Sequence, residues 1–130
     1  MPDQKLLEKF IGYSFKNERL LEEALTHRSY LNENPREGLS HNERLEFLGD
    51  AVLELAVTED LFARFPQYEE GTLTSFRAAL VNYIMLASIA RVLGLDGFLR
   101  LSRGEAKDMG RAREVILANA MEALIGAIYL

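Results

Sequence analysis

Hydrophobic positions recur at helical spacing along almost the whole chain of 130 residues. Two short apolar stripes near the amino terminus are formed by Leu6, Leu7, Phe10 and Ile11 and by Leu20, Leu21, Ala24 and Leu25. Asn17 stands just before the second stripe and is a candidate N-cap. The chain has no strand-like alternation of apolar and polar residues of useful length and no fixed-period repeat. The pattern therefore predicts an all-α fold.

Three longer helices are predicted in the rest of the chain. One begins near residue 41 and stops before Pro66, which cannot continue a helix. A second follows Gly71, with Thr72 or Thr74 as its cap, and is expected to run as one element to the glycines at positions 94 and 97. The last begins at about Arg113 and continues to the end of the chain.

Length and composition fit a single globular domain of 14.7 kDa with 48% hydrophobic and 27% charged residues. The chain has no cysteine, which excludes a disulfide scaffold, a thiolate zinc site and a cysteine nucleophile. Its histidines are His27 and His41, too few for a histidine-rich metal site, and packing or capping roles are favoured for both. No secretory signal and no apolar run of about 20 residues is present, so we expect a cytoplasmic protein without a membrane span.

Charge is distributed unevenly along the chain. The formal net charge of −5 argues, by itself, against nucleic-acid binding. However, residues 43–60 carry a net charge of −5, whereas residues 100–113 carry +3. The basic segment is ordinarily a solvated face, and phosphate positioning is its second interpretation.

Acidic side chains share one face of the long helix that starts near residue 41. At 100° per residue, Glu43, Glu46 and Asp50 fall within one stripe, opposite the apolar positions Leu45 and Leu48. Such a stripe can be a solvated helix face. The alternative is a binding site, and a second acidic position supports it.

Glu122 is the unusual residue of the last helix, which is apolar nearly all round. A buried carboxylate costs several kcal/mol unless a cation or strong donors compensate it. One possible partner is an arginine, Arg44 or Arg77; the other is a metal ion. Asn119 lies one helical turn before Glu122 and supplies a further oxygen.

Two helix-interior glycines offer a way to bring these groups together. Gly49 lies one turn after Glu46, and Gly126 lies one turn after Glu122. Since such glycines indicate close backbone approach, we expect the two helices to cross there. The side chains of Glu46, Asp50, Asn119 and Glu122 would then converge as an oxygen-only site, which suits Mg²⁺ and tolerates Mn²⁺.

The segment from His41 to Leu53, HNERLEFLGDAVL, closely resembles the signature of the ribonuclease III family. Other pieces agree in order along the chain: LTHRSY at 25–30, Glu70 with Gly71, LSRGE at 101–105 and ILANAMEAL at 116–124. The resemblance covers nearly the whole chain. It implies an all-helical endonuclease domain over residues 1–130 that hydrolyses double-stranded RNA with Mg²⁺. The expected products carry 5′-phosphate and 3′-hydroxyl ends with short 3′ overhangs, as in rRNA and mRNA processing.

The resemblance also assigns roles to individual residues. Asp50 and Glu122 are expected to be catalytic and, with Glu46 and Asn119, to bind the metal; Glu43 and Glu70 match acids near the cleavage centre. Phe47 matches the aromatic residue that enters the partner subunit of a homodimer, and its place on the acidic side of the helix favours an interface. Contacts with the RNA backbone are assigned to Arg103, Lys107 and Arg111.

Asn119 departs from the family pattern, which often has aspartate there. The alternative is therefore a weakened or inactive ribonuclease III-like module that binds RNA or the ribosome. A di-iron carboxylate bundle is disfavoured because no Glu-x-x-His pair is present. The chain ends within an apolar stripe, so we expect a truncated carboxyl end, and no double-stranded-RNA-binding domain fits within these residues.

Overall fold

A computed structural model describes residues 3–36 and 38–130 of the chain. The helical elements in order are α1 (Gln4–Ile11), α2 (Glu18–Ala24), α3 (Arg28–Glu33), α4 (Glu43–Arg64), α5 (Glu70–Leu80), α6 (Tyr83–Val92), the 3₁₀ helix η1 (Leu95–Phe98), α7 (Arg103–Lys107) and α8 (Arg111–Tyr129). β-type pairing in these ranges is confined to an isolated parallel bridge between Thr26 and Arg100. The all-α prediction is confirmed.

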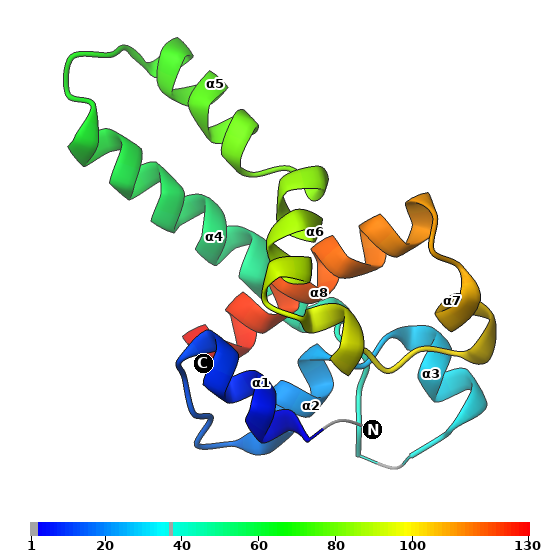
Figure 1. Cartoon of the computed structure of the whole chain (residues 1–130). Coiled ribbons are helices and arrows are strands. Elements are labelled where there is room, and N and C mark those ends of the chain that lie inside the picture. Colours follow the sequence, from blue (N-terminus) through cyan, green and yellow to red (C-terminus); the bar gives the residue numbers. More distant parts are fainter. Residues whose placement is uncertain (1–2, 37) are drawn as a thin grey trace.

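The carboxyl-terminal helix α8 is the centre of the core. It packs against α4 and α6 and touches α2, and Figure 1 shows these helices gathered around it. Leu117, Ala120, Ala123 and Leu124 are at most 1% exposed. α8 starts at Arg111, slightly before the predicted residue. A helix that is apolar nearly all round is thus buried, as expected.

The predicted single helix after Gly71 is two helices, which corrects that expectation. α5 ends at Leu80 and α6 begins at Tyr83, and the two are bent by 46°. The cause is Asn82, whose side-chain oxygen accepts from the Met85 N–H at 2.9 Å. Its amide group donates to two carbonyl groups at the end of α5, so Asn82 caps both helices at once.

The amino-terminal cap of α5 also differs from the prediction. Glu69 is the N-cap residue, so the helix begins at Glu70 and neither Thr72 nor Thr74 caps it. At the amino terminus Leu7 is fully buried, whereas Leu6 and Phe10 are about half exposed. Only part of the first apolar stripe therefore packs into the core. Asn17 caps α2 as predicted, accepting from the Arg19 N–H.

The distal part of α4 and the whole of α5 form an arm, residues 51–80, that extends away from the core in Figure 1. α5 contains no buried residue, and Leu61 is the buried residue of α4 within the arm. The two helices are held together near the tip by the rings of Phe65, Tyr68 and Phe76, whose centroids lie 5.5–5.7 Å apart. The arm is therefore anchored at its base and supported mainly by itself.

The periodicity did not predict the short elements α3, η1 and α7, and the loop between η1 and α7 runs beside the residues that precede α3. Arg100 joins them through its backbone: its carbonyl accepts from His27 N–H and its N–H donates to Leu25. No single helix within the described residues has both the length and the hydropathy to cross a membrane; the bent α5–α6 pair meets these criteria only when both helices are counted together.

Candidate active site

α4 and α8 approach each other more closely than any side chain would allow at the crossing. A Cβ atom built on Gly49 would lie 1.6 Å from the backbone oxygen of Glu122. One built on Gly126 would lie 2.4 Å from the backbone oxygen of Leu45. The two glycines therefore permit the crossing that the sequence predicted, and they fix α4 against α8 at the level of the acidic residues.

This crossing brings the predicted acidic residues from both helices to one hollow. The hollow has a volume of about 540 Å³ and is lined by Glu43, Glu46, Phe47, Asp50, Asn119 and Glu122. α4 supplies the first four and α8 the last two. The expected convergence of Glu46, Asp50, Asn119 and Glu122 is thus observed as a geometric fact.

The hollow is short of positive charge. Burial raises the pKa of Glu122 to about 8, with further contributions from its hydrogen bond to Asp50 and from the charges of Asp50, Glu46 and Glu54. Burial, together with the charges of Glu43 and Asp50, also raises the pKa of Glu46. Both carboxyl groups therefore resist ionisation unless a cation enters, which is the condition expected at a cation-binding site.

The donor chemistry of the hollow fits a hard divalent ion. The polar side chains that line it are carboxylates and one carboxamide, each of which offers an oxygen ligand, and Mg²⁺ prefers such ligands while keeping several waters. In the part of the chain that the structure describes, no three acidic or imidazole side chains form a ready-made metal site. The raised pKa of Glu122 means that a cation entering the hollow would compete with a proton for this carboxyl group.

The alternative role of Glu122, an ion pair with arginine, is not found. None of the ion pairs among residues 3–36 and 38–130 includes Glu122. Arg77, one suggested partner, lies in the arm and donates to the Thr58 hydroxyl at 3.0 Å. Within the described residues no basic side chain therefore compensates the charge of Glu122, and the neighbouring acids disfavour its ionised form.

Sequence reasoning missed one residue at the edge of the hollow. Arg28, the first residue of α3, places a guanidinium nitrogen 3.4 Å from one carboxylate oxygen of Glu43. The imidazole of His41 lies 3.5 Å from the other oxygen. Nothing in the local pattern of residues 25–30 indicated this contact, because it joins two segments through the fold.

The predicted capping role is confirmed for His27. His27 caps α3, with its Nδ1 accepting from the Ser29 N–H at 3.1 Å. Burial lowers the pKa of His27, which favours the neutral ring that this capping bond requires. His41 Nδ1 accepts from the Glu43 N–H at 3.4 Å at the start of α4.

Phe47 is exposed over 84% of its surface although it is a large apolar residue. It lines the acidic hollow, as its angular position on the helix indicated. A free surface of this kind beside carboxylates is unfavourable in water unless another apolar surface covers it.

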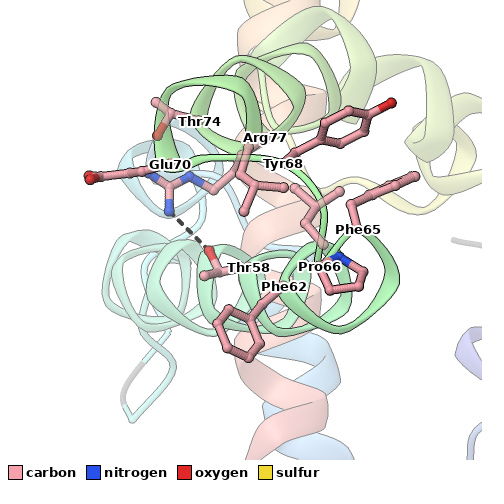
Figure 2. A pocket seen from close by; sticks show the side chains of 10 residues that line it. Thr58, Phe62, Phe65, Pro66, Tyr68, Glu70, Thr74 and Arg77 are labelled. Atoms are coloured by element: carbon pink, nitrogen blue, oxygen red, sulfur yellow. Dashed lines mark hydrogen bonds between the residues drawn. The ribbon is translucent and has the colours of Figure 1, made fainter.

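An apolar pocket of about 560 Å³ lies between the two helices of the arm. Figure 2 shows Phe62, Phe65 and Pro66 around it, with Arg77 bonded to Thr58 across the gap between α4 and α5. Glu70, predicted near the cleavage centre, lines this pocket. Within one chain the structure therefore does not bring Glu70 to the acidic hollow.

The arginine and lysine residues of the basic segment 100–113 fall into two groups, and the first makes ion pairs within the chain. Arg100 pairs with Glu22 at 2.6 Å. Arg113 is 5% exposed and binds Asp96 together with the backbone oxygens of Glu105 and Ala106. These two arginines are thus structural.

The three arginine and lysine residues predicted to meet RNA lie at the surface. Arg103 and Lys107, at the two ends of α7, are exposed. Arg111 is also exposed, and its guanidinium donates to the Tyr83 hydroxyl at 3.0 Å. The structure therefore leaves these residues accessible to a ligand.

Comparison with known proteins gives consistent matches along the chain. A family model described as Ribonuclease-III-like matches residues 17–130. Proteins named Ribonuclease 3 from Carboxydothermus hydrogenoformans and Oleidesulfovibrio alaskensis are each 54% identical over 95% of this chain. The chain covers 52% and 54% of them, respectively, and so spans about half the length of these curated relatives.

A solved structure shares the fold as well as the sequence. The nuclease domain of ribonuclease III from Campylobacter jejuni, described for flexibility in a region involved in dimer formation, is 45% identical with a TM-score of 0.88. The match covers 98% of this chain and 85% of that domain. With the acidic hollow, the glycine crossing and these matches together, the chain belongs to the ribonuclease-III-like family.

Proposed function

We propose that the chain is the catalytic domain of an Mg²⁺-dependent endoribonuclease that hydrolyses phosphodiester bonds of double-stranded RNA. The observation that carries the proposal is the convergence of Glu46, Asp50, Asn119 and Glu122 at the crossing of α4 and α8. Relatives named Ribonuclease 3 support the same reaction class. We propose that the chain acts in the cytoplasm, in rRNA or mRNA processing.

Glu46, Asp50, Asn119 and Glu122 would hold the ion, and Mn²⁺ could substitute for Mg²⁺. When bound, the ion supplies an activated water and neutralises charge on the phosphate. Asp50 and Glu122 are the proposed catalytic carboxylates; burial and the neighbouring acids raise the pKa of Glu122, and a bound cation would favour its ionised form. Hydrolysis is proposed to leave 5′-phosphate and 3′-hydroxyl ends with short 3′ overhangs.

Two apolar surfaces, the exposed ring of Phe47 and the pocket in the arm, support a homodimer. An exposed phenylalanine ring and an apolar pocket on the same chain are complementary, and a two-fold axis can satisfy both contacts at once. We propose that the partner subunit's Phe47 enters the arm pocket. Because Phe47 also lines the acidic hollow, this contact would bring Glu70 of one arm beside the acidic hollow of the other subunit. Two strands of a duplex would then meet two centres.

RNA is proposed to be held by its backbone rather than by its bases, because A-form duplexes expose phosphates and 2′-hydroxyls and hide the base edges. The exposed Arg103, Lys107 and Arg111 are the proposed backbone contacts. With a net charge of −5, the chain is expected to bind duplex RNA weakly and with strong salt dependence.

The proposal is tested by replacing Glu122 with glutamine. The variant is expected to abolish Mg²⁺-dependent cleavage of duplex RNA while circular dichroism shows unchanged helix content. Glu59→Gln, an exposed acid of α4 outside the hollow, is the matched control and should cleave like the parent. Cleavage by Glu122→Gln at the parental rate, or cleavage by the parent in the presence of a chelator, would reject the site.

Asn119 favours a second candidate, a module that binds RNA with little or no cleavage. An amide oxygen ligates Mg²⁺ more weakly than a carboxylate, so the site has one negative charge fewer than a four-carboxylate site. Sizing of RNA products from the parent and from Asn119→Asp separates the two functions. An inert parent that becomes a nuclease on this substitution would reject cleavage by the parent, as the second candidate predicts.

A further inference from the structure

The Glu43 carboxylate at the rim of the acidic hollow is held by groups that also bind phosphate. Arg28 approaches one carboxylate oxygen at 3.4 Å, and the His41 imidazole approaches the other at 3.5 Å. A guanidinium matches phosphate and carboxylate with the same planar fork of donors. The place that Glu43 occupies between them is therefore one that a phosphate oxygen could occupy.

Arg28 is held in position by the backbone around it. The buried Asn42, directly before α4, donates its N–H to the Thr26 carbonyl and its side-chain amide to the Ala24 carbonyl, both at 3.0 Å. These bonds fix the start of α4 against the turn that leads into α3. Arg28 and Glu43 thus face each other because the chain is bonded on both sides of the contact.

The same framework connects Arg28 with the basic segment. The Ser29 hydroxyl accepts from the Ser102 N–H at 2.9 Å, and the Glu33 carboxylate accepts from the Arg103 N–H at 3.1 Å. Figure 1 shows α3 beside α7 accordingly. Arg28, at the start of α3, therefore belongs to a helix that is bonded to the start of α7, where the exposed Arg103 lies.

Within the described residues, Arg28 is the arginine that forms an ion pair with a carboxylate of the hollow. An RNA phosphate entering the hollow meets the acids Glu43, Glu46, Asp50 and Glu122. The Arg28 and Glu43 side chains are 64% and 49% exposed, and exposed pairs of this kind contribute little to stability. Exchanging Glu43 for another anion as the partner of Arg28 therefore costs little free energy.

We propose that Arg28 binds a backbone phosphate of the RNA duplex close to the cleavage site, exchanging its contact with Glu43 for the phosphate. The inference rests on the proposed function and adds a binding residue to it. Arg28 acts in substrate binding, so its loss raises KM and leaves the chemical step intact.

The test compares Arg28→Gln, Arg28→Lys and a matched control, Arg64→Gln. Arg64 is 65% exposed and pairs with Asp60 at 3.1 Å, so it has the same exposure and the same kind of partner far along α4. Arg28→Gln is expected to raise KM for a short duplex RNA about tenfold, with kcat changed less than twofold. Its plot of log KM against log salt should lose about one unit of slope. Arg28→Lys should recover part of the loss, and Arg64→Gln should match the parent.

A double substitution separates phosphate binding from a role in merely holding Glu43. If Arg28 contacts phosphate, Arg28→Gln weakens binding in the Glu43→Gln background as well. If Arg28 acts only through Glu43, its substitution has no effect there, which would overturn the proposal. An unchanged KM or salt slope in Arg28→Gln would also overturn it.

A binding measurement keeps this test independent of cleavage. Anisotropy of a fluorescent duplex RNA is measured in the Glu122→Gln background, where the proposed function predicts no turnover. A Kd raised about tenfold by Arg28→Gln supports the phosphate contact even if the parent does not cleave. Cleavage by the parent combined with an unchanged Kd would reject Arg28 alone, and an inert parent would reject the proposed catalysis alone.

Discussion

Replacing Gly49 with alanine is expected to force apart the two helices that form the acidic hollow. The added Cβ would lie 1.6 Å from the Glu122 backbone oxygen, whereas ordinary contact begins at 3.4 Å. The shortfall is about 1.8 Å, and no side-chain rotation relieves it because the obstructing atom is helix backbone. α8 must therefore shift relative to α4, carrying Glu122 away from Asp50.

The expected cost follows from two opposing effects. Overpacking a core costs about 1–3 kcal/mol and occasionally more, and the overlap at Gly49 is at the severe end. Alanine returns about 1 kcal/mol through its better helix propensity. We expect a net loss of at least about 2 kcal/mol, which lowers Tm by roughly 8 °C in a domain of this size.

Urea and thermal unfolding followed by circular dichroism measure this loss. Gly71→Ala is the matched control, since Gly71 is also helical and no atom lies within 4 Å of its built Cβ. That variant should equal or exceed the parent in stability. A displacement near 1 Å can cost a hundredfold in rate, so Gly49→Ala should also lose cleavage. A Gly49→Ala protein with parental stability would refute the importance of the close crossing.

Three further predictions follow from the site and its supports. Without divalent ions, stability should fall as pH rises from about 5 to 9, because folded Glu122 keeps its proton up to a pKa of about 8 while its ordinary value is 4.5. The folded state binds the extra proton in that window, so urea titrations of Glu122→Gln should show a flatter profile; an equal slope would exclude Glu122 as its source. Phe47→Ala should shift the protein from dimer to monomer in sedimentation experiments, and a persistent dimer would contradict the Phe47 contact. Asn42→Ala should cost about 1–3 kcal/mol in urea unfolding by leaving the buried Ala24 carbonyl without its partner, and a neutral effect would show that the bond is dispensable.

The acidic hollow was predictable because both of its halves follow from helical geometry. The angular positions of Glu46 and Asp50 put them on one face of their helix. Glu122 is an acid in an otherwise apolar helix, which indicates that it needs a compensating partner. Gly49 and Gly126 then locate the crossing, because glycine in a helix interior is unfavourable without a packing reason. Each step uses information within one or two turns of one helix.

The features that escaped prediction depend on contacts between distant segments or on side-chain competition. Asn82 lies within an apolar periodicity that continues through it, so only its capping bonds reveal the break. Arg113 reads as a surface cation, but its guanidinium is buried against Asp96. Arg28 likewise reaches Glu43 only because the turns around Asn42 are bonded together.

The arm has a consequence for the dynamics of the molecule. Its helices bury little against the core, so the free energy that opens residues 51–80 locally should be smaller than that of global unfolding. Covering the arm pocket and the apolar side of α4 with a second subunit would raise this local free energy by mass action. Amide hydrogens of the arm would then exchange quickly in dilute protein and slowly in concentrated protein. The local stability of the arm would therefore depend on the concentration of the chain.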